Sequence, residues 1–246
     1  MLRLGVVALL MLSSLARAQE TTISLGEARA AFEKADRSLN QAWAAFRPTL
    51  PPEVFNMAKY KQREWLEARD QQALLASGAT DITRAKLSPS YFTTAAALTQ
   101  ARADWFRQRV VNKDEVMTGC WLDGYGGEID IVQQKGRLLF LLEVARAHGD
   151  PKLGNVNLGD LAGIALWNET IGWFSDKGRD STKPDETNIS FVLRDGRKLE
   201  ITEANAHHYQ GMAVSFDGIY YKVTPLNEDE QRKVMKAAES GEITDD

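Results

Sequence analysis

The feature that most constrains the fold is a change in hydrophobic periodicity near Val111–Asp114 of the 246-residue chain. Before this point, apolar residues recur at steps of three and four, which is the spacing of one helix face. After Met117, apolar and polar residues alternate between glycine-containing turns, which is typical of antiparallel strands. The sequence therefore predicts an α+β protein with a helical domain at 21–111, an antiparallel β domain at 117–226 and a tail at 227–246.

The helical region carries start and stop signals for three helices. Ser24 followed by Glu27 forms a capping-box pattern at the first helix. Pro51-Pro52 opens the second helix, Gly78 lies just past its end, and the third helix covers about 90–111. The expected inward stripes are Ala28, Phe32, Ala35, Leu39, Trp43 and Phe46 on the first helix, and Phe92, Ala95, Thr99, Arg102 and Phe106 on the third. We expect an antiparallel three-helix bundle with one shared core.

The β region is divided by turn signals that predict hairpins. Asp195-Gly196, Lys135-Gly136 and Asp217-Gly218 each lie between two alternating runs. The run before the last of these pairs, 212–216, is expected to be a strand. Sequential hairpins give a meander, which closes into a small barrel or folds into a sandwich, and the sequence leaves both open. In the tail, 227–240 is expected to form one exposed helix.

Residues 1–18 have the layout of a secretory signal peptide. Met1-Leu2-Arg3 is a short positive start, an apolar run follows to Leu15, and Ala16-Arg17-Ala18 fits a small-x-small cleavage site. The apolar run is shorter than the roughly 20 residues that a transmembrane helix needs. We therefore expect cleavage after Ala18, a periplasmic location and no membrane-spanning segment.

The charge and cysteine content restrict the classes of partner and site. The formal net charge is −4, and loss of Arg3 and Arg17 with the signal peptide would lower it to −6. A chain without a basic excess is not expected to bind nucleic acid. Cys120 is the single cysteine, which excludes an intramolecular disulfide and a multi-thiolate metal site. We interpret Cys120 as a small buried hydrophobe.

Three stretches of the helical half carry a family resemblance. Ala35–Trp43 follows the pattern Ala-Asp-x-x-Leu-Asn-x-Ala-aromatic, Gln62–Asp70 follows Gln-Arg-x-Trp-Leu-x-x-Arg-Asp, and Leu98–Arg102 follows Leu-Thr-x-x-Arg. In this order, on three expected helices, they resemble the N-terminal domain of the LprI-type lysozyme-inhibitor family. Many members have two cysteines where this chain has 71–73 and 93–95, so the family's disulfide staple is not expected here.

The β half resembles a module that follows this domain in some bacterial proteins, and Tyr125–Ile129 and Phe216–Tyr220 carry that resemblance. The resemblance of the helical half implies a periplasmic binding protein that inhibits a lysozyme-like muramidase or contacts another periplasmic protein. We expect no enzyme, since the sequence shows no catalytic motif. An acidic net charge favours encounter with a basic lysozyme. Two alternatives stay open: a carrier that holds a small ligand in its barrel, and an envelope enzyme, which would need converging acid and base groups.

Five polar side chains of the family-like stretches are expected to form a structural network: Asp36, Asn40, Gln62, Arg69 and Arg102. An arginine that faces a bundle core must be paired, because a lone buried charge is very costly. We therefore expect Asp36 to lie within salt-bridge reach of Arg69 or Arg102. The alternative interpretation is a charged groove for a partner.

His207-His208-Tyr209 is the most suggestive polar cluster of the β half. Neighbouring histidines on a strand point to opposite faces and chelate one metal poorly, so we expect an exposed loop tip. It is either a solvated turn or a contact for a partner. Glu128 and Asp130 share one strand face and are expected to face solvent. We predict no catalytic residue, no metal and no cofactor.

Overall fold

The computed structural model of the protein describes residues 23–111, 117–147, 156–178, 183–194 and 198–243. The predicted signal peptide at 1–18 and the predicted turn at Asp195-Gly196 lie outside these residues. In the described part, a run of helices precedes the strands, as the change in periodicity predicted, and one helix follows the last strand. The α+β class is confirmed.

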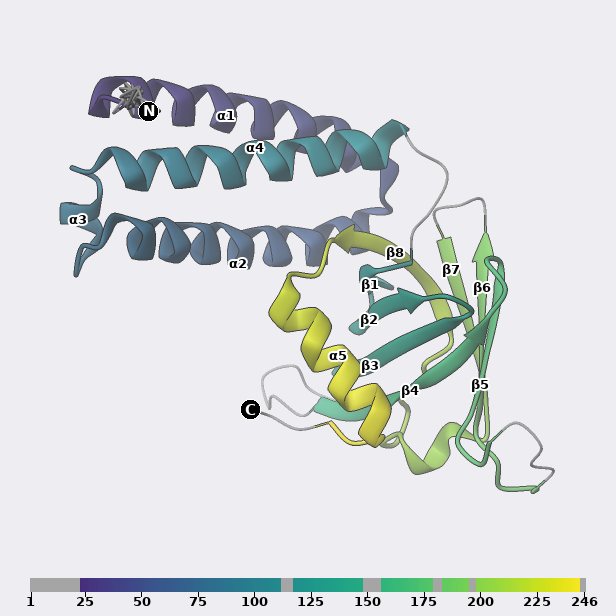
Figure 1. Ribbon diagram of the computed structural model, residues 1–246. Helices are drawn as coiled ribbons and strands as arrows, with labels where there is room; N and C mark the ends of the chain where they lie inside the picture. The colour runs from purple at the N-terminus through teal and green to yellow at the C-terminus, as the bar shows by residue number, and fades with distance from the viewer. Residues whose placement is uncertain (1–22, 112–116, 148–155, 179–182, 195–197, 244–246) are drawn as a thin grey trace, which may run out of the picture.

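Three long helices and a single-turn helix make up the N-terminal part. They are α1 (Leu25–Phe46), α2 (Pro52–Ser77), α3 (Ile82–Ala85) and α4 (Pro89–Val111), and a 3-10 turn, Arg47–Thr49, follows α1. Helix α4 packs against both α1 and α2 and lies between them in Figure 1. The backbones of α1 and α2 do not approach each other closely and α3 adds a turn, so the simple three-helix bundle that we expected is not confirmed.

The local signals for these helices act as predicted. The Ser24 side chain accepts a hydrogen bond from the Glu27 backbone and the Glu27 carboxylate accepts one from the Ser24 backbone, which is a complete capping box. Gly78 ends α2 in the left-handed conformation, with φ of +68°. The predicted stripe of α4 is buried throughout: Phe92, Ala95, Thr99, Arg102 and Phe106. On α1, Phe32 and Trp43 are only half-buried, because this helix packs mainly on α4.

Eight antiparallel strands form a closed barrel, which decides between the barrel and the sandwich. They are β1 (Gly119–Leu122), β2 (Gly127–Gln134), β3 (Arg137–Ala147), β4 (Val156–Trp167), β5 (Ile171–Ser175), β6 (Asn188–Arg194), β7 (Lys198–Ala204) and β8 (Gly218–Thr224). Each strand pairs with the next along the chain, and β8 pairs with β1. The barrel is thus a meander, as expected from sequential hairpins. Lys135-Gly136 forms the turn between β2 and β3, whereas Asp217-Gly218 forms no hairpin, because β7 ends at Ala204 and β8 begins at Gly218.

One expected strand is wrong. The segment 212–216 is not a strand, and β8 begins only at Gly218. The Glu203 carboxylate accepts hydrogen bonds from the Phe216 backbone N–H at 2.8 Å and the Ser215 hydroxyl at 3.1 Å. This side chain takes the backbone donor that a strand ladder would use. Val214 and Phe216 are buried in the barrel core instead.

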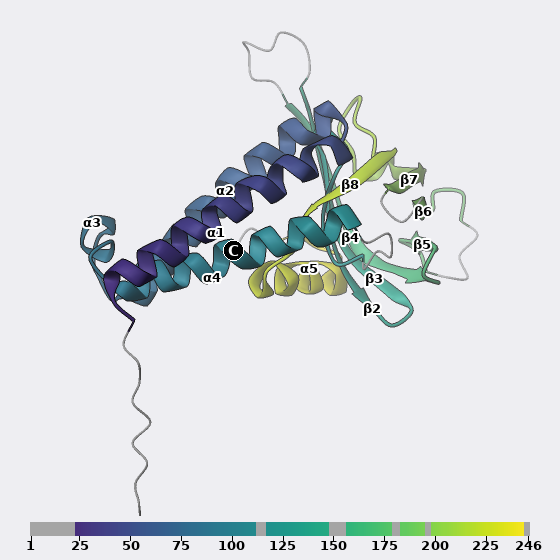
Figure 2. The same cartoon turned by 90° about the horizontal axis from the view of Figure 1, so that it is seen from above.

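Strands β1–β4 are packed on both faces, by the barrel interior on one face and by helices on the other. The interior is filled by large buried side chains, among them Trp121, Phe140, Phe191, Phe216 and Tyr220. Outside, the start of α2 and the C-terminal helix α5 (Glu228–Ser240) pack on β1–β4 (Figure 2). The tail helix is therefore present but not simply exposed, since Val234, Ala237 and Ala238 are buried against the barrel.

None of the helices in the described part of the chain combines the length and apolar character needed to cross a membrane.

Candidate functional site

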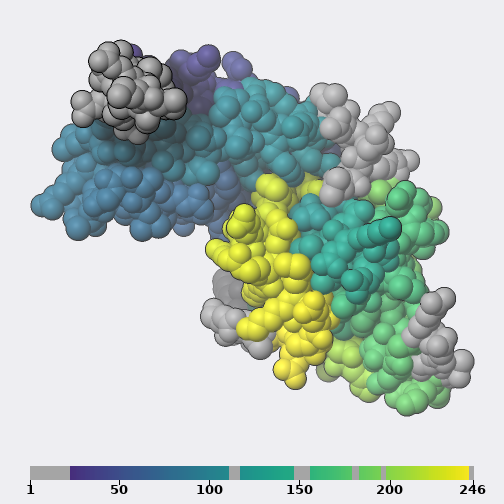
Figure 3. Space-filling view, viewed as in Figure 1, coloured from purple at the N-terminus to yellow at the C-terminus, as the bar shows by residue number. Residues whose placement is uncertain are grey.

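A charged groove of about 710 Å³ lies where the helical part meets the barrel. Helices α2 and α4, strands β1 and β2 and the segment from β8 into α5 line it, and Figure 3 shows α5 in yellow in the corner between the two parts. Its charged lining residues are Lys61, Glu64, Glu67, Arg102, Glu128, Asp130 and Glu230. Five of the seven are acidic, so the groove favours a cation or a basic partner.

Three side chains that are able to bind a metal meet on the floor of this groove. Cys120 of β1 lies opposite Asp130 of β2 in the strand register, and Glu128 lies two residues away on the same face. The Cys120 thiol donates a hydrogen bond to Glu128 Oε1 at 3.4 Å. The potential ligand atoms of all three residues lie within 4.8 Å of one another.

The prediction that Glu128 and Asp130 face solvent is wrong. Both point outward from the barrel, as the alternation of β2 requires, but the helices cover this part of the wall and both residues are half-buried. Burial, together with the neighbouring Glu128 carboxylate, raises the pKa of Asp130 to about 7. Asp130 Oδ1 is enclosed and has no hydrogen-bond partner.

Lys61 of α2 supplies a cation beside these carboxylates. Its Nζ lies 2.6 Å from Glu128 Oε1 and 3.8 Å from Glu64 Oε2. Burial opposes its charge, but the surrounding acidic groups, Glu128 foremost and Glu64 among the others, together outweigh burial, and the pKa of Lys61 is raised above its usual range. Burial and the charges of Asp130 and Glu128 raise the pKa of the Cys120 thiol well above its usual range. The floor therefore holds a protonated thiol and a lysine–glutamate ion pair.

Arg102 joins the helical part to the barrel at the edge of the groove. Its Nε donates to Gln62 Oε1 of α2 at 3.1 Å, and its Nη1 donates to Thr224 Oγ1 of β8 at 2.6 Å. The guanidinium also lies over the rings of Trp65 and Phe106, at 5.3 and 4.8 Å from their centroids. Burial lowers the pKa of Arg102 to about 10.

The structural network that we expected is only partly present. Gln62 and Arg102 are joined, but Asp36 accepts its hydrogen bond from Asn40 at 3.2 Å and Arg69 pairs with its neighbour Asp70 at 2.7 Å. In the described residues no ion pair links Asp36 to either arginine, so that prediction is wrong. Arg69 does face α1, but its guanidinium lies over the Phe32 ring, 5.3 Å from the ring centroid, and its ion pair is with Asp70 instead of Asp36.

The His207–Tyr209 cluster lies in a turn, as expected. A short 3-10 helix, Ala206–His208, presents His207 and His208 to solvent, with their ring centroids 4.0 Å apart. Tyr209 is half-buried, and its hydroxyl donates to Asp176 Oδ2 at 3.2 Å. Whether this turn contacts a partner stays a prediction.

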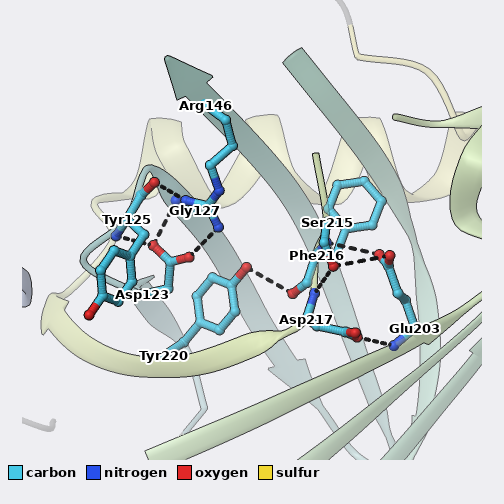
Figure 4. Close-up of polar contacts among 9 residues, drawn as sticks. All are labelled: Asp123, Tyr125, Gly127, Arg146, Glu203, Ser215, Phe216, Asp217 and Tyr220. Carbon is cyan, nitrogen blue, oxygen red and sulfur yellow. Dashed lines mark hydrogen bonds and ion pairs between the residues drawn. The ribbon is translucent and has the colours of Figure 1, made fainter. Parts of the chain in front are cut away.

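Figure 4 shows a second polar cluster, at the end of the barrel near the start of α2. The buried Asp123 carboxylate accepts hydrogen bonds from the backbone N–H groups of Tyr125 and Gly127, at 2.7 and 2.8 Å. It also forms an ion pair with Arg146 at 2.7 Å. These contacts hold the turn between β1 and β2 in one conformation.

The same cluster brings together the two stretches that resemble the β module. The Tyr220 hydroxyl donates to the Phe216 carbonyl at 3.0 Å, and Asp217 Oδ1 accepts from the Glu203 backbone at 2.6 Å. A Cβ atom on Gly127 would lie 2.7 Å from the Tyr220 hydroxyl. The recognisable residues of the module therefore have structural roles in closing the barrel end.

Fold and groove together define a class of protein: an eight-stranded antiparallel barrel with a helical part packed on its outer wall and a charged groove at the junction. Within this class, residues 14–106 match the family model described as lysozyme inhibitor LprI. The match ends inside α4, so it covers the helical part and less than half of the chain. The resemblance seen in the sequence is confirmed for this part. No curated protein and no solved structure matches the chain.

Proposed function

We propose that this protein is an exported, periplasmic binding protein that inhibits a lysozyme-like muramidase by protein–protein contact. The observation that carries the proposal is the match of residues 14–106 to the lysozyme inhibitor LprI family. The pattern of residues 1–18 supports export, since it has the layout of a signal peptide.

The groove supplies a surface that suits a basic enzyme. Glu64 and Glu67 of α2 and Glu230 of α5 are exposed along its edge, and we call these three residues the acidic rim. Two of them belong to the helix that the family match covers. Opposite charges across an interface mainly accelerate association and select the partner, so the rim is expected to guide encounter with a positively charged surface.

The His207–His208 turn is a second part of the proposed contact. It protrudes as an exposed turn, and Tyr209 anchors it through Asp176. A protruding element is suited to entering the cleft of a muramidase, whereas the concave groove is suited to receiving a basic side chain. The turn lies outside the matched residues, so it is tested separately from the rim.

The packing of the barrel does not favour the carrier hypothesis. Its interior holds a cluster of large buried side chains, including Trp121, Phe140 and Phe191. A ligand of the size of a small apolar molecule would have to displace several of them.

The proposal is tested by following the turbidity of a cell-wall suspension with lysozyme and a molar excess of the mature protein. We expect lysis to slow, and the inhibition to weaken as salt rises because the encounter is electrostatic. Unchanged lysis at low salt, across lysozymes of the chicken, goose and invertebrate types, would contradict the proposal.

The contact surface is tested with matched double variants. Glu64→Gln with Glu67→Gln should lower the association rate by about tenfold, whereas Glu33→Gln with Glu239→Gln removes the same charge from exposed positions outside the groove and should have a small effect. Equal effects of the two pairs would exclude the rim. His207→Ala with His208→Ala tests the turn, which is excluded if inhibition is unchanged.

A further inference from the structure

We propose that Cys120, Glu128 and Asp130 form a binding site for one thiophilic divalent metal ion, of which zinc is the best-fitting example. The site lies on the floor of the groove and goes beyond muramidase inhibition, since it depends on barrel residues that the family match does not reach.

The spacing of the three side chains fits a tetrahedral metal. Zinc–sulfur and zinc–oxygen bonds of about 2.3 and 2.0 Å place tetrahedral ligand atoms roughly 3.5 Å apart. Cys120 Sγ lies 3.4 Å from Glu128 Oε1, and all three ligand atoms lie within 4.8 Å of one another. The strand pairing holds this arrangement, because Cys120 and Asp130 are opposite each other in the register of β1 and β2.

A second observation concerns one oxygen of the Asp130 carboxyl. The carboxyl interacts with the Cys120 thiol, but its Oδ1 is enclosed and has no hydrogen-bond partner in the structure, which is rare for a buried polar atom. A cation between Asp130, Cys120 and Glu128 would supply the missing interaction. Because the groove is open above these residues, water is able to occupy a fourth position, as in zinc sites with three protein ligands.

The donor set selects the kind of metal. Calcium and magnesium take oxygen ligands, whereas a thiolate together with carboxylates favours zinc or a neighbouring transition metal. Binding requires the Cys120 thiol to lose its proton, which passes to solvent as the metal–sulfur bond forms. No oxidant or reductant is involved.

Lys61 is a competitor within the site. Its ammonium lies 2.6 Å from Glu128 Oε1, where it neutralises the same carboxylate that a metal would use. A metal ion must therefore displace this contact. It follows that removing the lysine charge should strengthen metal binding, whereas removing any of the three ligands should weaken it.

The test uses the full mature protein, freed of metal by a chelator and then titrated with zinc and with cobalt(II). We expect one ion per chain and, for cobalt, a near-ultraviolet thiolate-to-metal charge-transfer band. Cys120→Ser should abolish the band, and Asp130→Asn should weaken zinc binding by about tenfold or more. Lys61→Met should tighten binding, and Glu33→Gln, at an exposed position outside the groove, should leave it unchanged.

Two results would overturn the proposal. One is a wild-type protein that shows no cobalt–thiolate band at millimolar cobalt. The other is zinc binding that is equal in the wild type and in the Asp130→Asn and Lys61→Met variants, which would place the ion elsewhere. Circular dichroism of each variant separates loss of a ligand from loss of the fold. Muramidase inhibition by the metal-free protein is measured in parallel, so failure of the metal site and failure of the proposed function are distinguished.

Discussion

Replacement of Arg102 by methionine tests how the helical part is held to the barrel. Arg102 is 4% exposed and donates to Gln62 and Thr224, which belong to α2 and β8. In the described part of the chain, no carboxylate forms an ion pair with its guanidinium. The charge is thus buried with neutral hydrogen-bond acceptors and aromatic rings as its direct partners, and the Glu230 carboxylate favours it without forming an ion pair.

Two opposing contributions set the size of the effect. Burial lowers the pKa of Arg102 from 12.5 to about 10. At about 1.4 kcal/mol per pKa unit, this means that the buried charge costs on the order of 3 kcal/mol. Both pKa values lie above 7, so this cost is fully present at neutral pH. Against it, two hydrogen bonds from a charged donor contribute about 3 kcal/mol in total, at the low end of their usual range.

Methionine removes both contributions and keeps the contact with Trp65 and Phe106. We therefore expect Arg102→Met to change the free energy of unfolding by less than about 1.5 kcal/mol. Arg102→Lys keeps the buried charge but loses the planar group that lies over the rings, so it should be less stable than Arg102→Met by about 2 kcal/mol. Had Arg102 been paired with Asp36, as the sequence led us to expect, the methionine variant would be the strongly destabilised one.

The measurement is urea unfolding at neutral pH, followed by circular dichroism and tryptophan fluorescence. A loss of more than about 3 kcal/mol in Arg102→Met, with Arg102→Lys close to wild type, would refute this reasoning, because it would show that the charge itself stabilises the protein.

Two further predictions concern the groove and the barrel end. Burial and Glu128 raise the pKa of Asp130 from its ordinary value of 3.8 to about 7, so the folded state disfavours the ionised carboxyl. The contribution of Asp130 to the stability of the folded protein is therefore largest at low pH, where Asp130 is neutral, and this contribution is lost as pH rises through 7. Asp130→Asn should therefore be more stable than wild type at pH 8 in the presence of a chelator, by up to about 4 kcal/mol, and the difference should shrink toward pH 4; a constant difference would contradict the assignment. Gly126→Ala should destabilise the protein by more than about 2 kcal/mol, because φ is +101° and the new Cβ would lie 2.0 Å from the Ala145 carbonyl oxygen. Gly78→Ala is its control: φ is +68° but no atom lies within 4 Å of the new Cβ, so the cost in thermal or urea unfolding should be about 1 kcal/mol.

The parts of the fold that local pattern determines were predictable from sequence. The buried stripe of α4, from Phe92 to Phe106, follows directly from steps of three and four residues, and Lys135-Gly136 forms the turn between β2 and β3 with Gly136 at φ of +71°. These features depend on neighbours in the chain. The predicted strand at 212–216 was wrong because it depended on a residue distant in the chain. The Phe216 backbone N–H donates to the Glu203 carboxylate, and the alternation of residues in 212–216 gives no sign of this contact.

The groove was not predictable, because its residues are brought together only by tertiary packing. Lys61 and Glu128 are 67 residues apart, and no pattern in either segment points to the other. The alternation of β2 correctly predicted that Glu128 and Asp130 lie on the outer face of the barrel. It did not predict that helices cover this part of the face. The sequence signal that was available is an acidic strand face paired with a lone cysteine on the neighbouring strand. That signal becomes informative only when Cys120 and Asp130 are known to be in register.

The origin of the groove residues also limits what the family match is able to explain. Lys61, Arg102 and the Glu64 and Glu67 positions of the rim lie in the matched helices, whereas Cys120, Glu128 and Asp130 lie in the barrel. A helical domain of this type without the barrel would retain Glu64 and Glu67 of the rim but would leave Lys61 without Glu128 and Arg102 without Thr224. Its lysine would be solvated, its arginine would need another partner, and no thiol would be present. Electrostatic attraction of a basic partner is therefore a property that the helical domain is able to carry alone, whereas metal binding and the buried charges at the junction require both parts of this chain.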